Sequence, residues 1–422
     1  MAQLTDDCFA FSGPLLPLTE AERLISERIT PIAEIETAAL KGALGRVLAE
    51  DVIAPIDLPP FDNSAVDGYA VRHGDLSAAG ETRLSVVDRL TAGRAAVRPL
   101  PPRAAVRIFT GAPMPEGADT VFMQEDVQPE ETAVIVPSGL KAGSNRRLAG
   151  EDVRVGSVII PAGRRLDVQH IALAAAVGLT DVPVHRRLRV ALFSTGDEIV
   201  EPGTARPGAA LFDANRFLLA GLIERMGAIA TDLGILPDQR EPLAAAVAAA
   251  AATHDVVITS GGVSTGEADH VRAAIESIGR LVFWRVGIKP GRPVAMGVLP
   301  SGKSSAAFVG LPGNPVAAFV TFVRVVRPLL LRLSGAEIPP FVPLPVRAAF
   351  GYRKRRGRRE YVRVKLVRVA DGEIDAVKHP QEGAGVLTSL TETDGLVELP
   401  EDTTKVEPGN TVGFLSYATL VG

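Results

Sequence analysis

Residues 188 to 334 carry the pattern that most restricts how this chain can fold, because short apolar strands alternate there with longer helical runs. The predicted strands are RVALFS, ATDLGIL, DVVITS, LVFWRVG and AAFVGL, and the predicted helices are NRFLLAGLIERMG, EPLAAAVAAAAATH, ADHVRAAIESIG and PVAAFVTFVRVVRPLLLRL. This alternation indicates an α/β domain with a mostly parallel sheet. Parallel strands end together at one edge, where ligands usually bind, so the polar loops that follow them are expected to converge.

One segment of this region, VVITSGGVSTGEADH from Val256 to His270, is typical of a strand, a glycine-rich turn and a helix. Its adjacent glycines allow successive N–H groups to face one concave side, which suits an anion. Glu267 and Asp269 lie in the same turn and would repel a bare phosphate unless a divalent cation lay between them. The segment therefore suggests a phosphorylated ligand held with a metal. The alternative is an ordinary turn with Asp269 favoured by the helix dipole.

Four other polar loops follow the predicted strands: STGDEIV (194 to 200), PDQRE (237 to 241), KPGRP (289 to 293) and LPGNP (311 to 315). Each has a structural explanation, since Asp238 fits an acidic N-cap and Asn314 with Pro315 fits an N-cap followed by proline. Together, however, acidic side chains beside glycine-rich turns and Lys289 favour a metal and phosphate site. Carboxylate ligands of this kind suit Mg²⁺ better than zinc.

The segments on either side of residues 188 to 334 differ from that region in composition. Residues 51 to 144 are rich in Pro, Gly and Asp between short β-prone runs, which predicts a β-rich domain inserted into a discontinuous mixed α/β domain of residues 1 to 50 and 145 to 187. In that mixed domain we expect a helix over 18 to 30 with Thr19 as N-cap, a short helix over 37 to 41, a strand pair in GEDVRVGSVIIPAGRRL, and a helix between Asp167 and Gly178. Residues 335 to 422 are predicted to form a second β domain. The predicted fold class is α/β multidomain.

Composition excludes several classes of function. The chain has 422 residues, of which 46% are hydrophobic and 22% charged, and it lacks the long apolar run of a membrane helix. Its acidic N-terminus does not fit an export signal, so we expect a cytoplasmic protein with no membrane partner. The single cysteine, Cys8, excludes an internal disulfide, and the 6 scattered histidines form no zinc pattern. A net charge of −4 argues against a general nucleic-acid binder.

The other motifs leave alternatives open. Asp62, Asn63 and Asp67 fit turn positions, which is the common use of such residues. The basic run from Arg353 to Arg359 fits a solvated hairpin end, contact with RNA, or arginines that reach an oxyanion. The α/β region has neither the GxxxxGK[ST] motif nor a clear GxGxxG, which gives little support to P-loop ATP hydrolysis or dinucleotide redox chemistry.

Seven motifs in this order closely resemble the molybdopterin molybdenumtransferase family, the MoeA type related to the C-terminal E domain of gephyrin. They are PPFDNSAVDGYAV, TGAPMPEGADTVFMQED, GEDVRVG, FSTGDE, TSGGVSTGEADHV, KPGRPVAMG and LPGNPVAAFVTF. The resemblance covers almost the whole chain. It implies four subdomains, an elongated homodimer with a cleft between subunits, and insertion of molybdate into adenylyl-molybdopterin with release of AMP in a step that requires a divalent metal.

The resemblance also implies roles for individual residues. It implies catalytic roles for Asp67, Thr110, Asp152, Glu198, Asp238 and Asp269, with Asp238 and Asp269 as ligands of Mg²⁺. It implies a substrate pocket formed by Ser260, Gly261, Gly262, Ser264, Lys289, Pro293, Pro312, Gly313, Asn314, Pro315, Arg358 and Ser389. After LPGNP the alignment leaves Arg359 or Arg363 as alternatives to Arg358, and Thr388 as an alternative to Ser389. Asp394 stands where similar proteins often have Asn, which adds a negative charge near the expected oxyanion, and Thr265 and His270 are tolerated departures.

Two other functions remain as alternatives. Adenylyl transfer from ATP to molybdopterin uses a similar α/β domain, but the additional β-rich domains disfavour it. A dimeric scaffold of the gephyrin type is a binding function, and retention of the acidic loop residues disfavours it. The molybdopterin adenylyltransferase and molybdoenzyme-maturation proteins are the expected protein partners.

Overall fold

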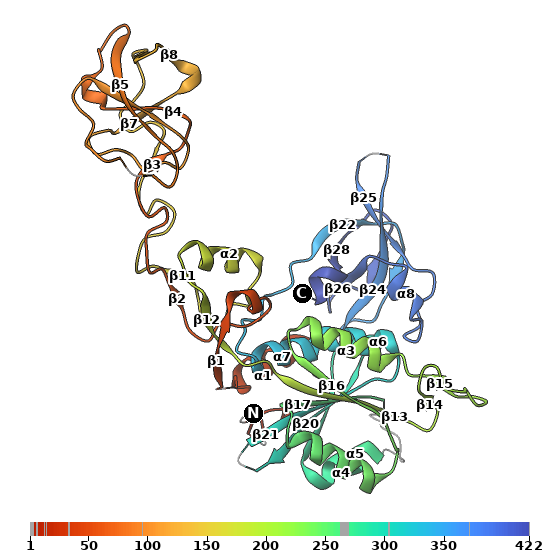
Figure 1. Ribbon diagram of the computed structural model, residues 1–422. Helices are drawn as coiled ribbons and strands as arrows, with labels where there is room; N and C mark the ends of the chain where they lie inside the picture. Colours follow the sequence, from red (N-terminus) through yellow and green to blue (C-terminus); the bar gives the residue numbers. More distant parts are fainter. Residues whose placement is uncertain are drawn as a thin grey trace.

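The computed structural model describes residues 4–5, 7–11, 13, 15–32, 34–94, 96–261, 270–302, 304–370 and 372–421. The chain forms a body from which a long arm extends (Figure 1). The body contains the α/β domain and the C-terminal β domain. The arm contains most of the mixed domain, which forms its connecting part, and the β-rich domain, which forms its far end. The predicted fold class is confirmed.

The α/β domain is built on a six-stranded sheet in the order β16-β13-β17-β21-β20-β18. Its strands are β13 (Arg189–Thr195), β16 (Ile229–Leu236), β17 (Val256–Ser260), β18 (Arg280–Arg285), β20 (Pro293–Ser301) and β21 (Ser304–Leu311). Neighbours β16, β13, β17 and β21 pair in parallel, as predicted. Strands β13, β17 and β21 are buried, as expected of parallel strands covered by helices on both faces, whereas the edge strand β16 is only partly buried. The sequence prediction omitted β20, which pairs antiparallel with both β21 and β18. This strand carries Pro293 to the same edge at which the parallel strands end.

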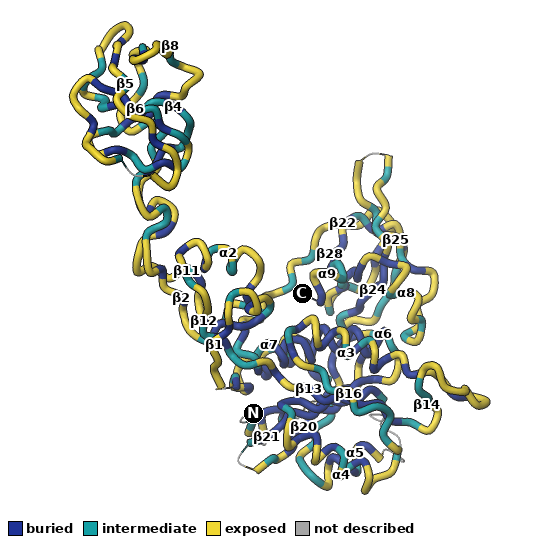
Figure 2. Tube along the Cα trace, viewed as in Figure 1, coloured by how far each residue is buried: buried dark blue, intermediate teal, exposed yellow. Residues whose placement is uncertain are grey.

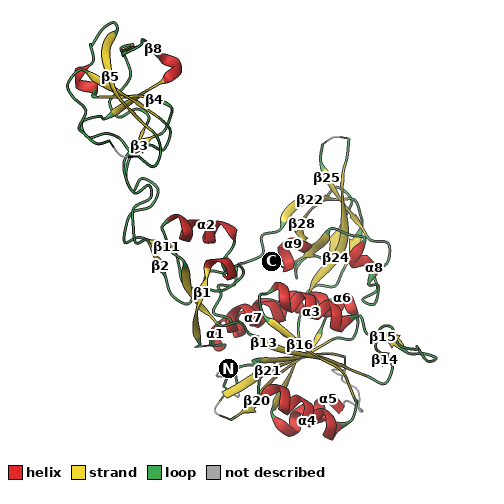
Figure 3. Cartoon of the chain, in the orientation of Figure 1, coloured by secondary structure: helices red, strands yellow, loops and turns green. Residues whose placement is uncertain are grey.

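Helices cover both faces of this sheet (Figure 3). One layer contains α4 (Arg240–Ala251) and α5 (His270–Ile278), which pack on β17, β18 and β20. The other contains α1 (Leu18–Arg28), α3 (Asn215–Arg225), α6 (Pro315–Thr321) and α7 (Arg327–Leu333). The long helix predicted over 315 to 333 is interrupted by a π-helical turn, η4 (Phe322–Val326). A short parallel pair, β14 (Ile199–Val200) and β15 (Leu211–Phe212), projects from the sheet edge.

The N-terminal part corrects three predictions. Helix α1 begins at Leu18 after Pro17, so Thr19 is a helical residue and not the N-cap. Residues 35 to 39 form strand β1 (Ile35–Ala39), paired with β12 (Asp181–His185), and only a 3-10 turn, η1 (Leu40–Gly42), follows; pairing with a distant strand outweighed the local helical pattern. The predicted strand pair after residue 150 is a single strand, β11 (Val158–Ile160), whose partner is β2 (Val52–Ile53).

The predicted helix after Asp167 is present as α2 (Val168–Ala176). Asp167 is its N-cap and forms a capping box with His170. Gly178, with a φ of 86°, follows its end.

The arm contains its own sheet, in the order β7-β4-β6-β5-β9-β8. Its elements are β4 (Gly68–Val71), η2 (His73–Asp75), β5 (Thr82–Leu90), β6 (Ala104–Ile108), β7 (Thr120–Met123), η3 (Gln124–Asp126), β8 (Gln128–Pro129) and β9 (Ala133–Val136). The chain enters and leaves through paired strands β3 (Asn63–Ser64) and β10 (Arg146–Arg147). Two small apolar cores lie within this sheet domain, whereas much of the connecting arm is exposed (Figure 2).

The C-terminal domain is a β-barrel, because β24 pairs with both β25 and β26 and so closes the sheet. Its strands are β22 (Leu344–Ala348), β24 (Arg359–Arg368), β25 (Ile374–Lys378), β26 (Gly395–Leu399) and β28 (Thr411–Ser416). A side pair, β23 (Tyr352–Arg353) and β27 (Lys405–Val406), and two short helices, α8 (Thr388–Thr391) and α9 (Tyr417–Val421), complete it. Strand β19 (Ile288–Lys289) pairs with β24 and thereby joins the barrel to the α/β domain.

Candidate functional site

A cavity of about 500 Å³ lies where β13, β17 and β21 end, and we call it the edge cavity. The predicted residues that line it are Glu198, Ser260, Gly261, Gly313, Asn314 and Pro315. Asn215, at the start of α3, holds the two loops together, because its Nδ2 donates to Ser260 Oγ at 2.8 Å and to the Gly313 carbonyl at 2.7 Å. The predicted convergence of these polar loops therefore occurs at one sheet edge.

Four buried oxygens near the ends of the parallel strands have no hydrogen-bond partner among the described residues: Ser194 Oγ, Thr195 Oγ1, Thr259 Oγ1 and Asp238 Oδ1. Buried polar atoms in native proteins are usually satisfied, so the unpaired oxygens of Ser194 and Thr195, which line the edge cavity, indicate a polar ligand there. Asp238 does not serve as the N-cap that its spacing suggested, because Gln239 holds that position in α4. Its carboxylate is thus available for another role.

The segment 262 to 269 lies outside the described residues, and with it Gly262, Ser264, Thr265, Glu267 and Asp269. Within the described ranges no group of three or more His, Cys, Asp or Glu side chains is arranged to hold a metal. The unpaired Asp238 oxygen is nevertheless a hard ligand of the kind that Mg²⁺ prefers.

A second cavity, of about 320 Å³, lies between the α/β domain and the barrel, and we call it the basic cavity. Its cationic wall consists of Lys289, Lys378 and Arg363, and the predicted residues Pro293, Pro312 and Asn314 also line it. Lys378 forms an ion pair with Glu382, another lining residue. Lys289 also forms an ion pair, with Glu360 at 3.2 Å, so Arg363 is the lining cation without a carboxylate partner among the described residues, and it makes this cavity suitable for a small oxyanion.

Arg363, and not Arg358, lines the basic cavity. Arg363 is 5% exposed, and its Nε donates to Ser389 Oγ at 3.0 Å while Nη2 donates to the Gln381 carbonyl at 3.0 Å. Burial lowers the pKa of Arg363. Arg358 instead donates to Glu360 Oε1 at 2.7 Å. Ser389 is fully buried behind Arg363, so it orients the guanidinium and does not line the cavity.

Glu360 is a buried carboxylate that organises one side of the basic cavity. Only 1% of it is exposed, and it accepts hydrogen bonds from Tyr352 Oη at 2.7 Å and Lys289 Nζ at 3.2 Å, as well as from Arg358. Burial alone would raise the pKa of Glu360, but the hydrogen bonds from Tyr352 and Arg358 and the Lys289 ammonium lower it. The Tyr352 ring also lies 5.8 Å from Lys289 Nζ and 5.7 Å from Lys378 Nζ. Glu360 therefore fixes the position of Lys289.

Residues 312 to 315 form the wall between the two cavities. Asn314 lines both, Pro312 faces the basic cavity, and Gly313 and Pro315 face the edge cavity. As predicted, Asn314 is the N-cap residue of α6 and Pro315 occupies its first turn, although the Asn314 side chain makes no capping hydrogen bond. A ligand that extends past this loop would contact both cavities.

The predicted residues of the arm are not brought to these cavities within one chain (Figure 1). Asp67 Oδ1 accepts hydrogen bonds from Thr110 N and Thr110 Oγ1, both at 2.8 Å, in the distal β-rich domain. These hydrogen bonds lower the pKa of Asp67. Asp152 is exposed in the connecting arm, where its N–H donates to the Leu58 carbonyl.

Two expectations for the C-terminal domain have definite outcomes in the structure. Asp394 does not add charge to the basic cavity, because its carboxylate accepts from Leu366 N at 2.7 Å and it is absent from the cavity lining. Part of the basic run is structural: Arg359 pairs with Glu398 at 3.1 Å and Glu401 at 3.0 Å. Sequence reasoning missed Lys378, His379 and Tyr352, since they lie in no glycine-rich motif and only the domain packing brings them to the cavity.

Comparison with known proteins identifies the class of protein. Residues 16–178 match the MoeA N-terminal region (domain I and II), residues 191–332 a probable molybdopterin binding domain, and residues 345–417 the MoeA C-terminal region (domain IV). Fold and matches together define a protein with a molybdopterin-binding type of α/β domain between MoeA-type flanking domains.

Similar proteins narrow this class to one family. The molybdopterin molybdenumtransferase of Haemophilus influenzae is 38% identical over 97% of this chain and 100% of its own length. That of a Nostoc species is 36% identical over 90% of this chain and 88% of its own. A crystal structure of a molybdopterin biosynthesis MoeA protein from Pyrococcus horikoshii OT3 superposes with a TM-score of 0.78 at 30% identity, covering 96% of this chain and 100% of that one. The chain belongs to the molybdopterin molybdenumtransferase (MoeA) family, which confirms the predicted family.

Proposed function

We propose that this protein inserts molybdenum from molybdate into adenylyl-molybdopterin and releases AMP. It is a transferase of molybdenum cofactor biosynthesis, as the names of its relatives at 33% to 38% identity support. The observation that carries the specific reaction is the pair of adjoining cavities that share the loop 312 to 315. One offers glycine-rich backbone and unpaired oxygens, and the other offers cationic side chains, of which Arg363 is buried.

In this proposal the basic cavity binds molybdate. Lys289 and Arg363 supply the positive charge, and Arg363 replaces Arg358 as the preferred arginine because it lines the cavity and Arg358 does not. Bidentate pairing of guanidinium with an oxyanion supports that choice. Ser389 and Glu360 are positioning residues, since they hold Arg363 and Lys289 respectively.

The edge cavity binds the adenylylated pterin in this proposal. Glu198, Ser260, Gly261 and Gly313 line the surface that would orient the phosphoanhydride beside the second cavity. Mg²⁺ is the proposed cofactor, held by Asp238 and Asp269, and it would neutralise charge on the phosphate oxygens when bound. The unpaired Asp238 oxygen supports this assignment.

We further propose that the working enzyme is a homodimer. Within one chain, Asp67, Thr110 and Asp152 line neither cavity. The arm also exposes apolar side chains that a second copy would cover: Ile53 (47% exposed), Phe61 (43%), Leu148 (50%) and Val155 (58%). No helix in the described part of the chain is long and apolar enough to cross a membrane. We place the enzyme in the cytoplasm, with the molybdopterin adenylyltransferase and molybdoenzyme-maturation proteins as partners.

Release of AMP from adenylyl-molybdopterin in the presence of molybdate tests the proposed metal site. Asp238→Asn is expected to lower the rate about a hundredfold, because a preorganised charge at the phosphoanhydride is lost. Glu241→Gln, a nearby exposed carboxylate in the first turn of α4, is the matched control and should retain normal activity. Asp269→Asn extends the test to the second proposed ligand. Near-normal, metal-dependent turnover by Asp238→Asn would contradict the proposed metal site.

Assays with different substrates distinguish the proposed reaction from the two alternative functions. Incubation with molybdopterin and Mg-ATP should give no adenylylated pterin, whereas adenylyl-molybdopterin and molybdate should give AMP. Net adenylylation would favour the adenylyltransferase function instead. Peptide binding by a protein unable to release AMP would favour a scaffold of the gephyrin type.

A further inference from the structure

A third cavity, of about 500 Å³, lies along the η4 turn and the start of α7, and we call it the arginine cavity. Helix α1, the η4 turn, the start of α7, the linker 338 to 341 and the barrel all contribute to it. Its cationic lining residues are Arg23, Arg324, Arg327 and Arg359. None of the residues proposed for molybdate or pterin binding lines this cavity.

Arg327 is the unusual member of this group. It is 7% exposed, and its Nε is buried with no hydrogen-bond partner in the described part of the chain. Its guanidinium carbon lies 4.7 Å from the centroid of the Phe341 ring, which packs against the group but carries no charge. Burial, together with repulsion from Arg324 and Arg165, lowers the pKa of Arg327 to about 10, so it stays protonated at neutral pH. A buried cation normally has an anionic partner.

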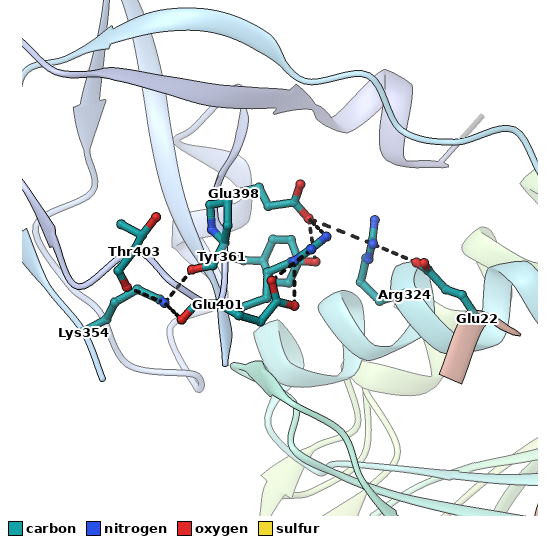
Figure 4. Close-up of polar contacts among 9 residues, drawn as sticks. Glu22, Arg324, Lys354, Tyr361, Glu398, Glu401 and Thr403 are labelled. Carbon is teal, nitrogen blue, oxygen red and sulfur yellow. Dashed lines mark hydrogen bonds and ion pairs between the residues drawn. The ribbon is translucent and has the colours of Figure 1, made fainter. Parts of the chain in front are cut away.

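The other cations of the cavity already have carboxylates. Arg324 lies between Glu22, at 2.8 Å, and Glu398, at 4.0 Å (Figure 4). Arg359 pairs with Glu398 and Glu401, and the exposed Arg23 pairs with Glu20 at 2.7 Å. These acids are therefore engaged, and none of them forms an ion pair with Arg327. Arg327 is therefore the one cationic lining residue that has no carboxylate partner among the described residues.

The backbone that carries Arg327 is also unusual. The π-helical turn η4 ends at Val326, immediately before Arg327, and places Arg324 and Arg327 on the same cavity wall. Both guanidinium groups lie against Phe341, Arg324 at 5.0 Å and Arg327 at 4.7 Å. Single π-helical turns inside α-helices are rare and frequently occur at functional sites.

We propose that the arginine cavity is a second ligand site, distinct from the two cavities of the proposed reaction, and that it binds a small molecule through a phosphate or carboxylate group held by Arg327. The volume of the cavity falls in the range of small-molecule sites. Its walls fit an organic anion, since Phe341, Ile338 and three prolines, Pro328, Pro339 and Pro340, provide an apolar surface beside the guanidinium. Arg324 lies beside Arg327 and would strengthen the attraction.

Titration calorimetry with two probes, inorganic phosphate and acetate, tests this site and distinguishes the two anionic groups. All proteins carry Lys289→Met, which removes a cation of the basic cavity and so reduces binding there. Arg327→Met is expected to weaken binding of the preferred probe about tenfold or more, because a hydrogen bond to a charged group is lost. Arg23→Met is the matched control, since this arginine lines the same cavity but is exposed and paired, and its affinity should stay within about twofold.

Thermal unfolding provides a readout independent of the titration. Without added anion, Arg327→Met should unfold at the same temperature as the parent or higher, because a buried unpaired charge has been replaced by an apolar side chain. Added phosphate or acetate should raise the unfolding temperature of the parent more than that of Arg327→Met. Equal affinities and equal anion responses in the two proteins would overturn the proposal. A change in dimer dissociation in Arg327→Met, with unchanged anion affinity, would also overturn it, since a second copy would then neutralise Arg327.

Discussion

In the α/β domain the predicted functional residues surround two adjoining cavities, whereas in the arm Asp67, Thr110 and Asp152 line none of the cavities found among the described residues. Glu198, Ser260 and Lys289 come from loops far apart in the sequence, and the sheet brings them to one edge. Asp67 and Thr110 satisfy each other by hydrogen bonds in the distal domain. Both regions carry equally specific sequence motifs. The specificity of a motif therefore does not reveal whether a single chain supplies all the residues of a site.

The difference indicates what each region contributes. The α/β domain has two buried cores, one on each face of its sheet, which fix the positions of the cavity loops. The β-rich domain has only small cores and is connected to the body by paired strands of two or three residues. A rigid binding region is therefore combined with an extended one that a second subunit can meet. Three predictions test this comparison.

Mixed dimers give the largest expected effect. Asp67→Asn and Asp238→Asn should each lower AMP release about a hundredfold when present in both subunits. If the arm of one subunit completes the cavity of the other, co-expressed variants should recover about a quarter of wild-type activity, because half of the dimers contain one intact site of two. The measurement is AMP release by the mixed preparation.

A second pair of variants controls that experiment. Glu198→Gln and Asp238→Asn both alter the α/β domain, so each subunit of a mixed dimer carries one altered α/β domain. Activity should then recover only if Glu198 and Asp238 of one chain contribute to the sites of different subunits. We expect no recovery from this pair. Recovery equal to that of the Asp67 and Asp238 pair would contradict the hypothesis that the arm of one subunit completes the cavity of the other. The absence of recovery from both pairs of variants would contradict it as well.

A smaller effect is expected within the body. Arg363→Gln should raise the KM for molybdate about tenfold to a hundredfold, because a buried charged donor of the basic cavity is lost. Arg358→Gln should change this KM less than about threefold, since Arg358 pairs with Glu360 outside the cavity lining. Steady-state kinetics at varied molybdate concentrations measure both values. The opposite order would assign the oxyanion to Arg358.

The smallest effect concerns the stability of the arm. Asp62 accepts from Ala149 N at 2.8 Å and from Arg146 Nε at 3.0 Å, next to the strands that join the arm to its β-rich domain. Burial alone would raise the pKa of Asp62, but these two hydrogen bonds lower it. Because the folded-state pKa is depressed, the stabilisation is complete above the unfolded-state value of about 3.9 and is lost as the pH falls through the folded-state value.

Asp62→Asn should therefore lower the free energy of unfolding of the β-rich domain by about 1 kcal/mol at neutral pH. The difference from wild type should vanish at acidic pH, where both side chains are neutral. Hydrogen exchange of the β4 and β6 amides measures it, with the exposed Glu131→Gln as control. A difference that persists at low pH would mean that Asn distorts the turn.

Much of the fold could be predicted because local pattern and burial agree. The parallel strands and the helices of the α/β domain have apolar periods that match their buried faces, and Asp167 and Pro315 mark helix starts by their own chemistry. The prediction was wrong where a distant partner decides the structure. Residues 35 to 39 form a strand only because β12 pairs with them, and β20 is a strand because its neighbours β18 and β21 flank it.

The candidate site shows the same limit. Motif residues such as Glu198, Lys289 and Asn314 could be named from the sequence, since turns and strand ends have local signatures. Arg363, Lys378 and Tyr352 could not be placed, because they reach the basic cavity through packing of the barrel on the α/β domain. The choice between Arg358 and Arg363 depends on side-chain direction along β24, which the run of arginines does not reveal.

The loop of residues 312 to 315 has a consequence for how this protein can change over time. Because Asn314 faces both cavities, a substitution there alters two binding surfaces in one event. In the proposed reaction, selection for a different oxyanion would be constrained by the cavity assigned to the adenylylated pterin, and the effects of mutations in the two cavities would depend on each other. Adaptation would proceed more freely at Lys378 or Tyr352, which belong to one cavity alone.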